Sequence, residues 1–238
     1  MKILTKEKRK LEKPKMRHEQ KYFINEADAW LLGRRLPLVM KRDENSDENG
    51  EYFIRSLYFD DNEDSAFFDK LAGVQNRDKY RIRIYNLSDK VIKLERKSKR
   101  GDYITKSSLT ISRSLCDQLI AGDTNHLQHA ADPLLQDFYV QMVTKGLHPA
   151  VIVDYVREAF VYPVEDVRVT LDKHLRSGLY SHDLFSPNVV TVPPVTDPTV
   201  ILEIKYNRKM PDMIPGLVDV VESQRCAISK YTLCRGYE

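Results

Sequence analysis

The sequence predicts an α+β fold with about seven or eight strands, mostly antiparallel, and several helices outside the sheet. Three observations support this prediction. Short segments rich in aromatic and β-branched residues alternate apolar and polar side chains with the two-residue period of a strand. Other segments space their apolar residues as helices do and carry capping residues at their ends. Finally, the polar faces of several predicted strands are mostly cationic.

The N-terminal half supplies most of the strands. We expect them at residues 17–24, 52–60, 78–85 and 91–99, with 104–111 as a further hairpin arm, a short turn at 86–90 and an acidic loop at 41–51. After the first strand, Asn25 is suited to cap a helix whose first turn holds Glu26 and Asp28. Pro37 ends or kinks that helix.

The C-terminal half combines helices with three more strands. Leu115 and Leu119 are spaced as on one helix, and a second helix is marked by Asp132 as cap, Pro133 in its first turn and Gly146 as stop. Strands are expected at 150–161, 167–173 and 200–206, an extended proline-rich loop at 186–198, and a last helix around 215–222.

The composition is that of a globular protein. Of 238 residues, 42% are hydrophobic and 31% charged, which excludes a disordered chain, a collagen-like chain and a membrane bundle. No stretch approaches the roughly 20 apolar residues that span a bilayer, and the N-terminus lacks the apolar segment of a secretory signal. The three cysteines form no CxxC pair, which suits a reducing compartment, so we expect a cytoplasmic protein.

Charge is distributed unevenly along the chain. Residues 1–17 hold eight cations and two glutamates, a net charge of +6, so the remaining chain sums to −3. We therefore expect a basic tail at residues 1–16 before a single domain at 17–238. A solvated tail is the simplest interpretation; peripheral contact with an acidic membrane surface is an alternative, and nucleic acid is not an expected partner.

The polar faces of the predicted strands repeat one pattern. One strand face carries Lys79, Arg81 and Arg83, a second carries Lys93, Glu95 and Lys97, and a third carries Glu203 and Lys205. A further strand contains Arg157, and the strand after it has Arg168, Thr170 and Asp172 on one face. A glutamate precedes a lysine by two residues in three places: Glu19/Lys21, Glu95/Lys97 and Glu203/Lys205. For any one strand a solvent-facing side explains this, but the repetition favours a shared environment.

A sheet that closes into a barrel would give all these faces one lumen. Unpaired buried cations each cost several kcal/mol, so such a lumen must hold water and anions. Arginine forks suit phosphate oxygens, and a few carboxylates among them would hold a divalent metal. The residues thus indicate a tunnel for a polyanion with metal, most simply a chain of phosphates.

Other chemistries lack their motifs. The sequence contains no GxxxxGK[ST], GxGxxG, HExxH or GxSxG, and its six histidines show no zinc spacing. A P-loop, a Rossmann site, a zinc protease and a serine hydrolase of the elbow type are therefore disfavoured.

Six segments together resemble a known family. They are RHEQKYFI, RSLYFDD, RDKYRIRIY, IKLERKSK, VILEIKY and ISKY, which occur in this order between Arg17 and Tyr231. The chain resembles the vacuolar transporter chaperone (VTC) domain, a polyphosphate-making member of the triphosphate tunnel metalloenzymes and a relative of the CYTH enzymes. It looks like a stand-alone bacterial type, without the membrane segment and SPX domain of the eukaryotic proteins.

The resemblance implies an eight-stranded antiparallel β-barrel, the triphosphate tunnel, with surrounding helices. It implies an ATP:polyphosphate phosphotransferase that moves the γ-phosphate of ATP onto a growing polyphosphate chain with Mn²⁺ or Mg²⁺ as cofactor. ATP and inorganic polyphosphate are then the expected partners. A triphosphate or polyphosphate hydrolase of the same fold and a non-catalytic polyphosphate-binding module remain as alternatives.

The resemblance also implies roles for individual residues. The catalytic residues would be Arg81, Arg83, Lys97 and Lys230, and further phosphate ligands would be Lys21, Lys79, Arg157, Arg168 and Lys205. Glu203 would bind the metal, while Glu19 and Glu95 would either support the metal or orient neighbouring cations. Tyr58 and Ser56 are expected to shape the tunnel wall, and Lys93, Lys99 and Lys106 to be surface or rim charges.

One position departs from the pattern of the relatives. CYTH enzymes begin with ExExK, whereas this chain has Arg17, Glu19 and Lys21 at the corresponding places. The arginine removes one possible metal ligand, which disfavours triphosphatase or cyclase chemistry and mildly favours the polymerase.

Overall fold

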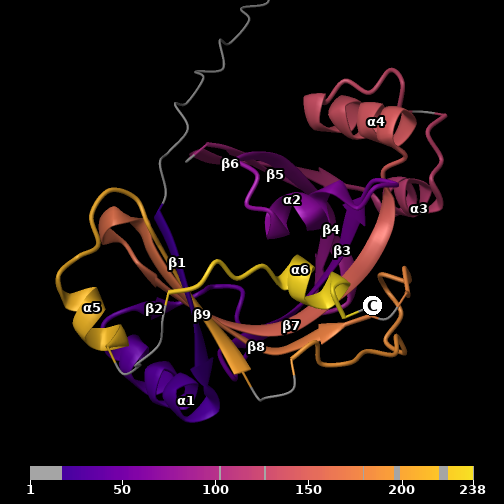
Figure 1. The fold of residues 1–238 in the computed structure, drawn as a ribbon. Helices are drawn as coiled ribbons and strands as arrows, with labels where there is room; N and C mark the ends of the chain where they lie inside the picture. The colour runs from indigo at the N-terminus through magenta and orange to yellow at the C-terminus, as the bar shows by residue number, and fades with distance from the viewer. Residues whose placement is uncertain are drawn as a thin grey trace, which may run out of the picture.

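The computed structural model describes residues 18–101, 103–125, 127–178, 180–195, 199–219 and 225–237. The predicted basic tail at residues 1–16, together with Arg17, lies outside this part of the chain. Within it, one long curled sheet carries helices on its outer side and two short helices, Ser65–Leu71 and Lys230–Arg235, at its inner side (Figure 1).

The described strands all belong to one sheet, and every pairing in it is antiparallel. They are β1 (His18–Asn25), β2 (Lys41–Arg42), β3 (Glu51–Asp60), β4 (Asn76–Tyr85), β5 (Ser88–Arg100), β6 (Tyr103–Ile111), β7 (His148–Tyr162), β8 (Val167–Ser177) and β9 (Thr199–Tyr206). Their order is β1-β9-β8-β7-β3-β4-β5-β6, with the short β2 beside β7. The α+β class and the antiparallel sheet are thus confirmed, with β2 as a strand that sequence patterns missed.

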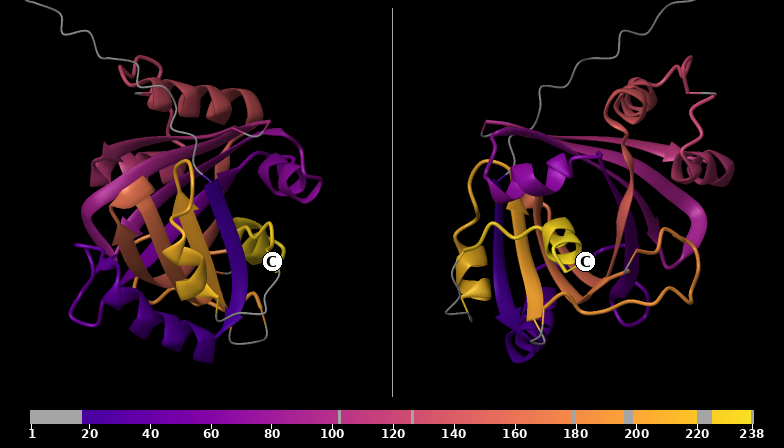
Figure 2. Two further views of the ribbon diagram at one scale, coloured as in Figure 1. Left: turned by 90° about the vertical axis from the view of Figure 1, so that its left-hand side faces the viewer. Right: turned by 45° about the vertical axis from the view of Figure 1, so that its right-hand side comes forward.

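The predicted closed barrel is not what forms. Within the described residues β1 and β6 end the sheet and do not pair with each other. The free edge of β1 instead contacts the chain at Arg225 and Cys226. Tyr22 forms an isolated β-bridge with Arg225, and the Cys226 N–H donates to Lys21 O at 2.9 Å. The sheet nevertheless curls until its two halves face each other (Figure 2). Across the opening, Lys97 Nζ of β5 lies 3.1 Å from Glu19 Oε2 of β1, so an ion pair spans the place where a barrel would have backbone pairing.

The helices are α1 (Glu26–Arg35), α2 (Ser65–Leu71), α3 (Arg113–Ala121), α4 (Pro133–Lys145), α5 (Met213–Val218) and α6 (Lys230–Arg235), with 3₁₀ turns at Leu36–Leu38 and Val164–Asp166. The predicted caps are confirmed, since Asn25 accepts from Asp28 N at 2.8 Å and Asp132 accepts from Leu134 N at 2.8 Å. Gly146 ends α4 with a left-handed φ of 66°. Among the helices described, none has the length and hydropathy needed to cross a membrane.

Two short helices were not predicted. Helices α2 and α6 have seven and six residues, too few for a helical period to show in the sequence. Tyr231 and Cys234 of α6 are almost completely buried, together with residues of β7 and β8, so tertiary packing stabilises this helix. Its position matters for function because α6 begins at Lys230.

The two faces of the sheet differ in polarity. On the convex face, Ile82 and Leu94 are fully buried with Phe138 of α4 and Cys116 of α3, and a second apolar cluster packs the other half of the sheet against α1 and α5. The opposite, concave face carries the charged residues and a third apolar cluster around α6. This separation follows from the two-residue alternation along each strand.

Candidate functional site

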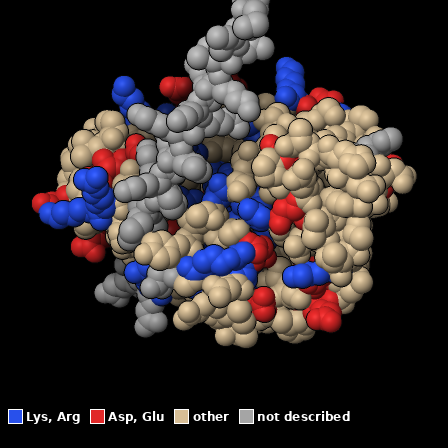
Figure 3. Space-filling view, turned by 90° about the horizontal axis from the view of Figure 1, so that it is seen from above, with Lys and Arg blue, Asp and Glu red and all other residues tan. Residues whose placement is uncertain are grey.

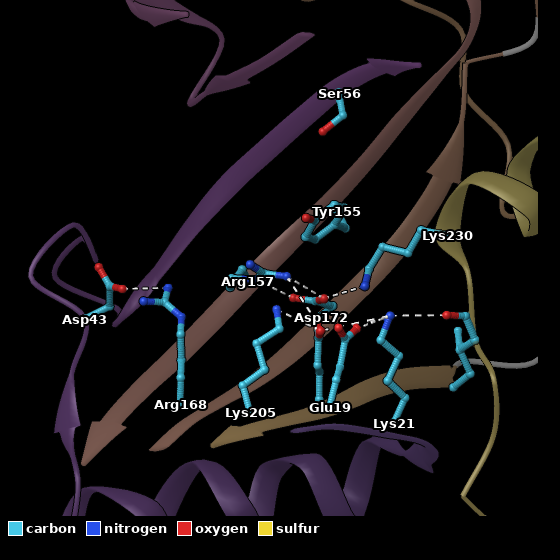
Figure 4. Close-up of polar contacts among 12 residues, drawn as sticks. Glu19, Lys21, Asp43, Ser56, Tyr155, Arg157, Arg168, Asp172, Lys205 and Lys230 are labelled. Carbon is cyan, nitrogen blue, oxygen red and sulfur yellow. Dashed lines mark hydrogen bonds and ion pairs between the residues drawn. The ribbon is translucent and has the colours of Figure 1, made fainter. Parts of the chain in front are cut away.

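Strand register brings the predicted site residues onto one face. Residues directly opposite each other on neighbouring strands share a face of the sheet. On one half of the sheet, Lys21 pairs with Glu203, Arg157 pairs with Asp172, and Lys205 has Glu19 on one side and Arg168 on the other. On the other half, Arg81 pairs with Glu95 and Lys79 pairs with Lys97. Arg83 lies two residues from Arg81 and therefore on the same face. Lys230 reaches the same concave face from α6. Several of these side chains converge in Figure 4.

Two adjacent carboxylates form the centre of one group. Lys205 Nζ lies 2.8 Å from Glu203, and Lys21 Nζ lies 2.8 Å from Glu19 and 4.0 Å from Glu203. Burial and the Glu203 carboxylate raise the pKa of Glu19, but Lys97 and Lys21 outweigh them, so the pKa of Glu19 is lowered. Burial opposes ionisation, yet Lys205 and Lys21 hold the pKa of Glu203 well below its usual range. Both carboxylates are therefore anionic at neutral pH.

Asp172 organises a second, deeper group. Its carboxylate accepts two hydrogen bonds from the Arg157 guanidinium, at 2.6 and 2.8 Å, and pairs with Lys230 Nζ at 2.5 Å. Asp172 is 1% exposed, so this is a buried ionic triad. Burial opposes ionisation, but Arg157 and Lys230 keep the pKa of Asp172 far below its usual range. The ring of Tyr155 lies below both cations, 5.3 Å from Arg157 and 4.9 Å from Lys230.

The opposite half of the concave face holds Arg81 in a fixed position. Its guanidinium contacts Glu95 at 2.6 Å and donates to the Tyr58 hydroxyl at 2.8 Å. Glu95 also pairs with Lys106, which the sequence had placed at the surface or rim. Burial opposes ionisation, but Arg81 and Arg83 lower the pKa of Glu95 to about 2. The carboxylate thus orients cations here.

Arg83 has a different environment from the other buried arginines. It is 7% exposed, and its guanidinium donates to Ser56 Oγ at 3.1 Å and to the Tyr155 hydroxyl at 2.9 Å. Among the described residues, no carboxylate lies within ion-pair distance of it. A buried cation with only neutral partners is costly unless an anion binds it, because hydroxyl groups do not neutralise its charge.

Arg168 lies at the far end of the same face. It pairs with Asp43 at 2.7 Å and donates to the Tyr52 hydroxyl at 3.0 Å. In Figure 4 this pair lies apart from the residues around Glu19. Arg168 is therefore placed on the predicted face but not within the central cluster.

The concave face carries an excess of positive charge. Burial together with Lys70 and Arg77 lowers the pKa of Lys79 to about 7. Burial also lowers the pKa of Lys205 to about 8, despite the carboxylate beside it. Seen from above, Lys and Arg side chains gather in the central hollow of the molecule (Figure 3). Such a surface favours the binding of a strongly anionic ligand.

The three predicted metal ligands do not come together. Glu19 and Glu203 are neighbours, whereas Glu95 is engaged with Arg81 and Lys106, and no group of three acidic, His or Cys side chains in the described residues is arranged to hold a metal. Two adjacent anionic carboxylates are still suitable oxygen donors for a hard divalent cation whose remaining ligands are phosphate oxygens and water. The site therefore fits such a metal through Glu19 and Glu203.

Sequence patterns missed or undervalued several residues of this face. Tyr155 received no role, although its position two residues before Arg157 already places both on one side of β7. Asp172 was noted only as a neighbour of Arg168 and Thr170. Ser229 accepts a hydrogen bond from Lys79 Nζ at 3.0 Å, a contact that depends on where α6 packs.

Comparisons with known proteins agree with this fold. Residues 16–237 match the family model described as the VTC domain. A candidate adenylate cyclase from Bacillus halodurans has a similar structure, with 13% identity, a TM-score of 0.50 and 80% of each chain covered. A conserved hypothetical protein from Pyrococcus furiosus is 11% identical with a TM-score of 0.44, over 87% of this chain and 94% of that one. Curated proteins give no match.

Proposed function

The chain belongs to the VTC domain family, and on that basis we propose that it is a metal-dependent polyphosphate polymerase. It would transfer the γ-phosphate of ATP onto a growing polyphosphate chain and release ADP. The observation that carries this proposal is Arg83, a buried guanidinium on the concave face whose described partners are two hydroxyl groups. A phosphoryl group would supply the anionic partner in direct contact that Arg83 does not have among the described residues.

Such a transfer needs no covalent nucleophile. The acceptor is a terminal phosphate and already an oxyanion, so catalysis consists of in-line alignment and neutralisation of charge. Arg81 is held by Glu95 and Tyr58, and Arg83 by Ser56 and Tyr155. Because both forks are fixed before the substrate binds, they stabilise the transferring phosphoryl group without reorganising.

Glu19 and Glu203 are the residues that would hold the divalent ion. When bound, Mn²⁺ or Mg²⁺ would supply further neutralisation of the charge on the phosphate groups. Lys21 and Lys205 keep these two carboxylates ionised and oriented by their contacts of 2.8 Å.

The direct test is incubation of the purified protein with ATP, Mn²⁺ and a short polyphosphate primer, followed by gel analysis and ADP measurement. A ladder of growing polymer with matching ADP release supports the polymerase. Release of orthophosphate or pyrophosphate without polymer indicates a hydrolase. Thermal stabilisation by polyphosphate without any turnover indicates a binding module.

Replacing Glu203 should raise the metal requirement. In Glu203→Gln the Mn²⁺ concentration for half-maximal activity should increase at least about tenfold, because one anionic oxygen donor is lost. A metal titration of the initial rate measures this, with Glu63→Gln, an exposed change of the same type, as control. An unchanged titration in Glu203→Gln would exclude Glu203 as a ligand.

A further inference from the structure

The last strand of the sheet, β6, has an open outer edge (Figure 1). All nine of its residues pair with β5, and within the described residues no backbone group bonds to its other side. The edge of β1 is different, because the Cys226 N–H donates to it. A row of unpaired backbone N–H and C=O groups is a template on which a further strand can pair.

This edge lacks the features that usually protect an exposed strand. Proteins protect such edges with proline, with bulges, with charged side chains or with a covering segment. Between Tyr103 and Ile111 there is no proline, and the register with β5 runs without a shift. The one charged residue of the strand, Lys106, is paired with Glu95 of the same chain. Its charge is therefore not free to keep another strand away.

Apolar side chains are exposed along the same edge. Tyr103 is 61% exposed and Ile104 is 41% exposed. A cavity of about 300 Å³ lies beside Ser107 and Ser108, between β6 and the start of α4 at Pro133. Helix α4 thus leaves space beside the middle of the strand. Exposed apolar groups next to unpaired backbone groups favour contact with another strand over contact with water.

We propose that the outer edge of β6 pairs with the same edge of a second copy of this chain, antiparallel and about a two-fold axis at Ser107. A two-fold axis lets one surface contact itself on both copies. Directly opposite residues of an antiparallel pair share a face of the sheet. The axis must therefore pass through a pair of identical residues, because any other centre would set the two faces of the strand against each other.

Two properties of the strand select Ser107 as this centre. Only a centre at Ser107 pairs the strand over its full length, with Tyr103 opposite Ile111 of the second copy. The same register sets Lys106 opposite Ser108, whereas a centre at Lys106 would place two lysines directly opposite each other, which is destabilising. The resulting continuous sheet satisfies the backbone groups of both edges.

Sedimentation velocity of the full chain without ligand measures the association. Wild type should show a monomer–dimer equilibrium with a Kd on the order of 1–100 µM, as expected of a small interface. Ser108→Lys places a lysine opposite Lys106 twice in each dimer and should weaken the association at least about tenfold. In the monomer the new lysine lies opposite Glu95, so the loss would not arise from unfolding. Thr144→Lys, the same change at an exposed position of α4, should match wild type.

Disulfide trapping tests the register. Directly opposite residues of an antiparallel pair have Cα atoms about 4.5–5.5 Å apart, which a disulfide can span. In a Cys226→Ser background, which removes the exposed native thiol, Ser107→Cys should therefore give a disulfide-linked dimer under mild oxidation. Thr105→Cys is the matched control. Thr105 is more exposed than Ser107, but in the proposed register the two copies of it lie about 14 Å apart, at about 3.4 Å per residue.

A chain that stays monomeric up to about 100 µM would overturn the inference. Equal linkage in Ser107→Cys and Thr105→Cys would also overturn it, because it would indicate random collision. A dimer whose Kd is unchanged in Ser108→Lys would place the interface elsewhere and reject the β6 edge. These measurements use neither ATP nor a phosphate ligand, so their outcome is independent of the polymerase assay.

Discussion

Arg83→Ala should lower the rate of polymer formation by about 100-fold or more, because in the proposed reaction it removes a fixed donor to the transferring phosphoryl group. The fold should persist. Ser56 and Tyr155, the two hydroxyl partners of Arg83, would then be accessible to water in the hollow. The loss should fall mainly on turnover, since Arg81 and the remaining cations of the concave face still attract the substrate.

The measurement is the initial rate of ADP release with primer at saturating ATP, paired with a thermal unfolding curve. Arg113→Ala is the matched control, because Arg113 lies on α3 in an exposed pair with Asp117. Arg83→Lys separates charge from geometry: a lysine keeps the charge but loses the fork, so only part of the rate should return. Wild-type turnover in a folded Arg83→Ala protein would remove Arg83 from the catalytic residues.

Asp172→Asn should lower the free energy of unfolding by about 3–5 kcal/mol, because removing one member of a buried ionic group leaves uncompensated charge. Asp172 is the shared partner of Arg157 and Lys230, and these two cations would then repel each other next to Tyr155. The asparagine has nearly the same shape, so the loss reports charge and not a cavity.

Urea denaturation of Asp172→Asn against Asp117→Asn measures this effect. Asp117 forms an exposed pair with Arg113, for which a loss of at most about 0.5 kcal/mol is expected. Polyphosphate should raise the melting temperature of Asp172→Asn more than that of wild type, since a bound polyanion replaces the missing carboxylate. A destabilisation below about 1 kcal/mol would show that Arg157 and Lys230 do not depend on Asp172.

The expected loss of turnover in Arg83→Ala and the expected loss of stability in Asp172→Asn both arise from how charges are paired on the concave face. Some cations, such as Arg81 and Arg157, have carboxylate partners that hold them in a fixed orientation. Others, such as Arg83 and Lys79, have only hydroxyl or aromatic partners among the described residues. The second kind has no carboxylate in ion-pair contact within the described chain, so we expect its replacement to affect ligand binding more than stability.

The residues of the concave face were largely predictable, because alternation along a strand is a local property. Once Arg81, Arg83 and Lys79 occupy alternate positions, they must share a face whatever the strand pairs with. Helix caps such as Asn25 and Asp132 are local in the same sense, and the structure confirms both. The prediction of a closed barrel was wrong, because closure depends on which segment pairs with the free edge of β1. No local sequence pattern specifies this partner.

The sequence alone determined which residues share the concave face, where the main strands and the long helices lie, and the family to which the chain belongs. Only the tertiary structure decided which cation pairs with which carboxylate, because register and curvature bring together residues far apart in the chain. The packing of α6 places Lys230 in contact with Asp172 and Ser229 in contact with Lys79. The same fold keeps Glu95 away from the neighbouring carboxylates Glu19 and Glu203. A short segment of sequence shows how its side chains alternate, but it does not show which distant segment it will pair with.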